Sequence, residues 1–358
     1  MSAHEILIAV MAAFAALGAL DRIFGNRLGL GKEFEEGILA MGSLAIAMVG
    51  VITLAPVLAA ILKPVVVPVF RFLGADPAMF AGSILACDMG GGALAMEMTA
   101  DTDAALLGGV ITGSMLGATI VFTIPVAMGI LSEEDRPAMA RGILCGIVTI
   151  PLGVFAGGLV AGFSVSMLLP NILPIVLIAA LIALGLWKAE DAMIRGFAAF
   201  GKGVVAVITV GLAAAIVEEL TGFTVIPGMA PIAEGFQTVG AIAIVLAGAF
   251  PLVLVLTKLL RKPLTRLGKL IGINETAAAG LVASLANSIA TFGLVKDMDK
   301  RGKVVNIAFS VSAAFVFGDH LGFTAGFAPE MLPAMILGKL VGGISAVLVA
   351  LWLTRKEG

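Results

Sequence analysis

The sequence predicts an all-α polytopic membrane protein built as an inverted repeat, on three observations. The first is composition: of 358 residues, 60% are hydrophobic and 13% charged, whereas soluble domains carry about 25% charged residues. The second is that the apolar residues form continuous blocks, long enough for helices to cross a bilayer core of roughly 30 Å. The third is a weak internal repeat, described below.

Two of the apolar segments, 77–99 and 275–295, are interrupted by polar residues and glycines. If every segment crossed the membrane, the basic loops 258–275 and 296–303 would lie on opposite sides, against the positive-inside rule. If the two interrupted segments are re-entrant or broken hairpins, nearly all lysines and arginines fall on the cytoplasmic side, with the N-terminus outside. The remaining segments, expected to cross, lie near residues 5–20, 38–62, 104–131, 142–165, 169–187, 203–218, 236–258, 304–318 and 330–354.

The internal repeat has a constant offset of 198 residues, which pairs Gly82 with Gly280 among other weak matches. It divides one transmembrane domain into a first repeat, 1–160, a linking helix, 161–198, and a second repeat, 199–358. Each repeat has about five helical segments, four crossings and one hairpin. Because the linking helix adds one crossing, the second repeat starts on the opposite side. Many secondary transporters are built this way, with their sites where discontinuous helices meet near the midplane.

Glycine accounts for 45 residues, many of them four apart on expected helices. Gly109, Gly113 and Gly117 form one such ladder, and Gly338 and Gly342 form another. Small residues at this spacing let helix backbones approach closely in lipid. We therefore expect these glycines at helix contacts.

Composition also excludes several classes of protein. The net charge is −2 and there is no basic stripe, so nucleic acid is not an expected partner. Cys87 and Cys145 both lie in apolar blocks, where cysteine is usually a small packing residue. We find no metal-ligand cluster, phosphate loop or Ser/His/Asp set. The sequence thus predicts no enzyme, no bound metal and no cofactor.

The first interrupted segment carries the sharpest candidate for a binding site. Asp88 lies in its middle, and the glycines 90–92 that follow predict irregular backbone. Ionisable residues at membrane depth are costly and usually functional, and a carboxylate beside open backbone suits a small ammonium ligand. We predict that Asp88 binds substrate and that Gly90 contributes backbone. The alternative is a structural aspartate that caps a half-helix or pairs with Lys339.

The second interrupted segment carries Asn287, within one place of the repeat-mate of Asp88. An amide can accept a hydrogen bond from an ammonium or donate one to a hydroxyl. Asn287 is therefore a candidate for substrate binding, and helix packing is the alternative.

Asp319 and His320 lie at the outer end of the expected crossing near 304–318. His320 is one of two histidines and could sense or relay protons; the alternative is a histidine at the membrane interface. A Gly-Asp pair also occurs in intramembrane aspartyl proteases, but Val316 replaces the first glycine of their motif. We take both residues as candidates for the substrate site. Lys339, central in the last helix, needs a partner or a depressed pKa, and the two aspartates are the possible anions.

Six blocks carry a family resemblance. The most specific is Phe-Gly-Asp-His-Leu-Gly-Phe-Thr-Ala-Gly at 317–326, and in these blocks the chain resembles the ethanolamine-utilisation EutH family. The others lie at 34–42, 79–90, 143–153, 274–280 and 296–299.

The resemblance implies a multi-pass protein of the bacterial plasma (inner) membrane that admits ethanolamine for breakdown to acetaldehyde and ammonia. Its partners would be ethanolamine and the lipid bilayer, with a homo-oligomer left open. No second carboxylate accompanies Asp88 on its hairpin, so we expect passive or proton-linked movement rather than a sodium site. Two alternatives stay open: a channel or transporter for another small amine or ammonia, and a membrane-embedded enzyme or structural subunit that transports nothing.

Overall fold

A computed structural model describes residues 2–355, without the side chains of 261 and 264. Residue 1, where the first expected repeat begins, and residues 356–358, where the second ends, lie outside the described residues. All the regular structure within the described residues is helical. The prediction of an all-α polytopic membrane protein is confirmed, since seven helical segments in this part of the chain are long and apolar enough to cross a bilayer.

The principal helices follow the order expected from the sequence. They are α1 (Ala3–Ile23), α2 (Leu30–Phe72), α3 (Ala78–Ile84), α4 (Gly92–Met98), α5 (Thr102–Leu106), α6 (Ile124–Ile130), α7 (Arg136–Ile147), α8 (Ile150–Val160), α9 (Val165–Thr221), α10 (Ile232–Ile271), α11 (Glu275–Ala286), α12 (Ser288–Leu294), α13 (Lys300–Ala313), α14 (Asp319–Phe327) and α15 (Leu332–Leu353).

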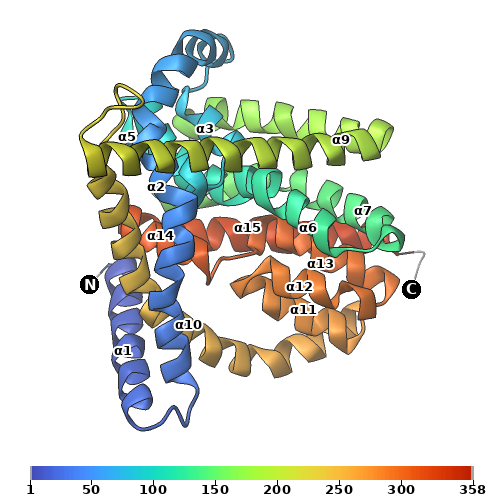
Figure 1. The fold of residues 1–358 in the computed structure, drawn as a ribbon. Coiled ribbons are helices and arrows are strands. Elements are labelled where there is room, and N and C mark those ends of the chain that lie inside the picture. The colour runs from blue at the N-terminus through green and yellow to red at the C-terminus, as the bar shows by residue number, and fades with distance from the viewer. Residues whose placement is uncertain (1, 356–358) are drawn as a thin grey trace.

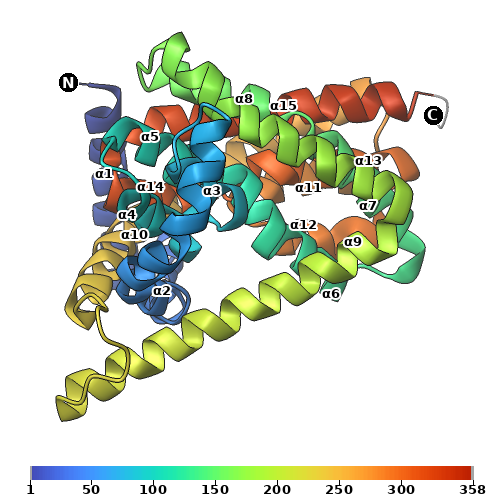
Figure 2. The same ribbon diagram turned by 90° about the horizontal axis from the view of Figure 1, so that it is seen from above.

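Two groups of helices form the molecule. Helices α1, α2 and α10 pack on one another at one end, and α7, α8, α13 and α15 form a second bundle that runs across them (Figure 1). Helix α9 contacts both groups. It reverses direction at Ala189, whose backbone is not helical, so its two parts form the V seen in Figure 2. These two parts correspond to the separate crossings expected near 169–187 and 203–218.

Both interrupted segments double back on themselves. In the first, α3 and α4 pack together, and the Thr99 hydroxyl donates to the Asp76 carboxylate at 2.9 Å, which joins the two ends of the segment. In the second, α11 and α12 pack together, and the Asn274 amide donates to the Asp297 carbonyl at 3.0 Å. Each segment is therefore a helical hairpin, and we refer to them as hairpin 1 (78–98) and hairpin 2 (275–294).

The open ends of the two hairpins lie at opposite ends of the protein. The Asp76 amide, before hairpin 1, donates to Asn171 at the start of α9. Lys303, after hairpin 2, is paired with Asp135. The helical run Glu133–Val160 begins near the Lys303–Asp135 pair and leads toward the start of α9, where the Asp76–Asn171 contact lies. The hairpins thus enter from opposite ends, as an inverted repeat requires, although their orientation across a bilayer stays a prediction.

The order of elements also recurs at the offset derived from the sequence. Helices α1 and α9 end at residues 23 and 221, and α5 and α13 begin at residues 102 and 300, in each case 198 residues apart. A long helix, α2 or α10, precedes each hairpin. The assignment of two repeats and a linking helix remains our proposal for the architecture, supported by this spacing.

The prediction of one continuous helix near 304–318 is wrong. Helix α13 ends at Ala313, and α14 begins only at Asp319. Between them Phe315 has a left-handed backbone, with φ of 63°, and its N–H donates to the Ser284 carbonyl of hairpin 2 at 3.1 Å. Because hairpin 2 supplies acceptors to the interrupted backbone, the break is tolerated inside the protein. Asp319 therefore starts a second half-helix rather than following the outer end of a crossing.

Hairpin 1 packs closely on the helical run Thr102–Ile130, which is almost entirely buried. Part of this run, Leu107–Gly117, is π-helical. A side chain added at Gly117 would place its Cβ 1.9 Å from the Leu85 carbonyl of hairpin 1. The expectation that the ladder of glycines lies at helix contacts is met here, and this contact seats the tip of hairpin 1.

The inverted arrangement predicts that Ala100, after hairpin 1, and Lys300, after hairpin 2, are reached from opposite sides of the membrane. Both residues are exposed. In a background with Cys87→Ala and Cys145→Ala, an impermeant thiol reagent outside the cell should label Ala100→Cys and spare Lys300→Cys. Labelling of both variants from the same side would contradict the inversion.

Candidate functional site

A cavity of about 580 Å³ lies where hairpin 1 meets the break before α14. Its other walls come from α2, from the helical run that ends in α6, and from the second part of α9. The polar side chains in its described lining are Ser43, Asp88, Lys202, Asp319 and His320, and the remaining lining residues are apolar. Three of the five residues predicted from the sequence therefore share one cavity: Asp88, Asp319 and His320.

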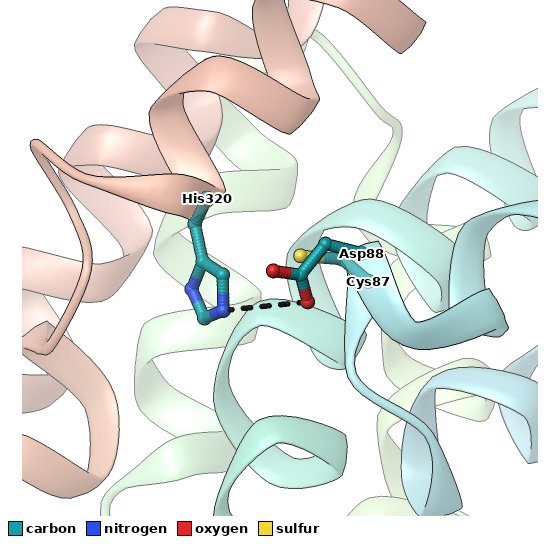
Figure 3. A group of neighbouring side chains, drawn as sticks. All are labelled: Cys87, Asp88 and His320. Carbon is teal, nitrogen blue, oxygen red and sulfur yellow. Dashed lines mark ion pairs between the residues drawn. The ribbon is translucent and has the colours of Figure 1, made fainter. Parts of the chain in front are cut away.

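The tip of hairpin 1 presents Asp88 to this cavity. Its helix α3 ends before Leu85, whose backbone is extended, and an irregular turn over Cys87–Gly91 follows. The Asp88 carboxylate faces the imidazole of His320, with Oδ1 3.9 Å from Nε2 (Figure 3). The side chain of Asp88 is 15% exposed and that of His320 is 4% exposed. The carboxylate thus borders the cavity, and the imidazole lies behind it in the protein.

Lys339 lies on the other side of the same imidazole. Its Nζ is 3.0 Å from Nδ1 of His320 and donates to the carbonyl of Ser114, on the π-helical stretch. Lys339 is 1% exposed. The sequence suggested an aspartate as the partner of this lysine. Among the described residues its hydrogen-bond partners are instead a histidine and a carbonyl. The histidine stands between Lys339 and Asp88.

Asp319 is the first residue of α14 and is half-buried on the cavity wall. A negative charge is favoured there because the free N–H groups at a helix N-terminus carry partial positive charge. The break in the preceding helix creates this terminus inside the protein. Two carboxylates from distant parts of the chain therefore face one cavity.

Comparison with known proteins identifies the family. Residues 3–353 match the family described as ethanolamine utilisation protein, EutH. The chain belongs to the EutH family. No solved structure matches it.

Relatives resemble the chain over its whole length. A protein of Listeria monocytogenes named as a probable ethanolamine permease is 61% identical over 99% of this chain and 95% of its own. One of Escherichia coli with the same name is 48% identical over 100% of this chain and 97% of its own. The uncharacterised protein YxeR of Bacillus subtilis is 52% identical over 100% of this chain and 96% of its own. Together with the seven apolar segments, EutH membership makes this a multi-pass bacterial membrane protein.

Gly90, predicted to contribute backbone to the site, shapes the turn rather than lining the cavity. Its φ is 96°, a conformation that other residues rarely adopt. An added Cβ would lie 2.2 Å from Cγ2 of Val51 on α2. Glycine at this position lets the chain turn beside α2 so that Asp88 faces the cavity.

Asn287 lies at the tip of hairpin 2 and is not in the described lining of the cavity. Its Oδ1 accepts from the N–H of Ile289 at 2.7 Å, which caps the N-terminus of α12. Of the two roles considered from the sequence, this geometry favours the structural one.

Cys87 joins the site unexpectedly. Its Sγ, an oxygen of Asp88 and a ring nitrogen of His320 lie within 4.8 Å of one another (Figure 3). Such a donor set could hold a metal ion, but the ammonium of Lys339 beside His320 would repel one. We keep the absence of a metal as a prediction. The sequence offered one signal for this cluster, the adjacency of Cys87 to Asp88.

Asn287→Ala should lower stability by about 1 kcal/mol through loss of the cap, whereas Asn287→Ser, which keeps a capping oxygen, should change it little. Thermal unfolding in detergent measures this difference. Neither variant should alter the affinity for a small amine by more than about twofold, a ratio worth roughly 0.4 kcal/mol. A stable Asn287→Ser variant with greatly reduced affinity would instead support a direct contact with substrate.

Proposed function

We propose that this protein carries ethanolamine across the bacterial plasma (inner) membrane and binds its ammonium group at Asp88. The observation that supports the site most strongly is the cavity itself, whose lining is mostly apolar and includes the carboxylates of Asp88 and Asp319. Relatives of similar length named as probable ethanolamine permeases support the choice of substrate.

The chemistry of the cavity matches a small alkylammonium ion. Ethanolamine is mostly cationic at neutral pH, and the carboxylates supply the counter-charge and the acceptors that an ammonium needs. The two methylene groups can pack on apolar lining such as Phe122 and Phe315. An ionised carboxylate at membrane depth costs a few kcal/mol, and a bound cation offsets part of that cost. A small substrate cation therefore suits this cavity better than a neutral solute.

A transporter is favoured over an enzyme by the position of the site. The tip of hairpin 1 and a broken helix meet at the cavity, and secondary transporters use discontinuous helices in this way. The proposal uses a single copy of the chain, and assembly into a homo-oligomer is compatible with it. The remaining rivals are transport of another small amine or of ammonia, and a membrane-embedded enzyme or subunit that transports nothing.

We propose passive or proton-linked movement of the substrate. Asp88 has no second carboxylate on its own hairpin, but Asp319 supplies one to the cavity, so the number of carboxylates does not by itself exclude a sodium site. The histidine and cysteine side chains that lie close to Asp88 supply a thiol and an imidazole, whereas hard cations prefer a cage of oxygen ligands. Asp88, Asp319 and His320 are groups in the cavity lining that can exchange protons.

Purified protein in liposomes tests the proposal. Radiolabelled ethanolamine should enter faster than it enters empty liposomes, and an imposed sodium gradient at constant pH should not accelerate it. Unlabelled amines and ammonium, added as competitors, separate ethanolamine from the rival substrates. Uptake no faster than in empty liposomes at several pH values would contradict a transport function.

Asp88→Asn in the same assay tests the site. The amide keeps the size and much of the hydrogen bonding but removes the charge. A charge-assisted contact is worth about 1.5–3 kcal/mol, so affinity for ethanolamine should fall about ten- to a hundredfold. The matched control is Asp297→Asn, the same change at an exposed position outside the cavity. Unchanged affinity in well-folded Asp88→Asn protein would show that Asp88 is structural.

A further inference from the structure

We propose that Lys339 sets the charge that the cavity accepts, so that the site takes an amine with one positive charge and rejects one with two. This inference rests on the proposed function, because it presupposes a cationic substrate. It concerns a residue that does not line the cavity and that acts from behind His320.

The contacts of Lys339 suit a protonated amine that is held inside the protein. An ammonium has three N–H donors and no acceptor. Its Nζ donates to the Ser114 carbonyl and lies 3.0 Å from Nδ1 of His320. When Lys339 is protonated, Nδ1 accepts a hydrogen bond from it, and the ring proton of neutral His320 is then on Nε2. This N–H then faces the carboxylate of Asp88, 3.9 Å away.

The charged groups at the cavity have a net charge of minus one in this proposal. The proposal takes both carboxylates as ionised and Lys339 as protonated. Asp88 and Asp319 then contribute two negative charges, neutral His320 contributes none, and Lys339 contributes one positive charge. Burial disfavours the thiolate, so we count the buried thiol of Cys87 as neutral. Lys202 also lines the cavity but at an exposed position, and the proposal takes its charge as screened by water and salt. One ammonium therefore neutralises the cavity.

A second positive charge could approach Asp319, but with Lys339 protonated it would leave the cavity with a net positive charge. Lys339 would then repel the second ammonium through surroundings of low dielectric. An uncompensated buried charge is strongly unfavourable. Discrimination of this kind works by penalising the wrong ligand rather than by improving the right one.

A purely structural lysine would give a different result. If Lys339 only ties α15 to the π-helical stretch through Ser114, its replacement would weaken folding and would affect all amines alike. If it sets the accepted charge, its replacement would change the ratio of affinities for two amines of equal length. Propanolamine and trimethylenediamine form such a pair, since they differ by a hydroxyl in place of a second ammonium.

The experiment measures dissociation constants for ethanolamine, propanolamine and trimethylenediamine on the purified full-length protein at neutral pH. The wild-type protein should favour propanolamine over trimethylenediamine by tenfold or more. Lys339→Met should reduce this preference about tenfold, equivalent to about 1.4 kcal/mol, and Lys339→Arg should retain it. Lys188→Met, which removes an exposed charge remote from the cavity, should leave the ratio unchanged.

If Lys339→Met does not fold, Lys339→Gln provides the same test, because it keeps donors for Ser114 and His320 and removes the charge. An unchanged ratio in either folded variant would overturn the proposal. So would a wild-type protein that binds both amines equally, a result that needs no variant. Failure of the wild-type protein to bind ethanolamine at all would instead count against the proposed function.

Discussion

Charges that lie between apolar helices must be compensated within the protein, and this requirement organises the centre of the molecule. Asp88, Asp319 and Lys339 bear formal charges at a depth where ionised groups are costly. His320 stands between the first and the last of these, with Nε2 toward the carboxylate and Nδ1 toward the lysine. In our proposal, these charges leave one negative charge in excess at the cavity. The account of substrate binding follows from that residual charge.

The backbone meets a parallel requirement. Interrupted helices leave N–H and C=O groups that lipid cannot satisfy. Hairpin 2 supplies an acceptor to the break before α14 through Ser284, and the tip of hairpin 1 packs against the glycines of the π-helical stretch, Gly117 among them. These contacts let irregular backbone persist inside the protein. They also create the helix terminus at Asp319 and the turn at Asp88, so the same devices that satisfy the backbone position the carboxylates.

Sequence patterns predicted the helices and the main carboxylate because these depend on local composition. Hydrophobic blocks and the flanking charges locate the crossings, and Asp88 stands out because a charge in an apolar block is costly. The break near Phe315 was missed since its acceptors come from hairpin 2, distant in the sequence. For the same reason Lys339 was expected beside a carboxylate rather than His320, and Lys202 was not expected to line the cavity. Asn287 was chosen by repeat symmetry, which does not distinguish a cap from a ligand contact.

The central claim is that a small ammonium ion binds in the cavity bordered by Asp88 and Asp319. A cryo-EM map of the full-length protein in nanodiscs with saturating ethanolamine tests it most directly. We expect ligand density in the cavity, with the amine within hydrogen-bonding distance of the Asp88 carboxylate and Lys339 still beside His320. Ligand density elsewhere in the protein, with the cavity empty, would contradict the account.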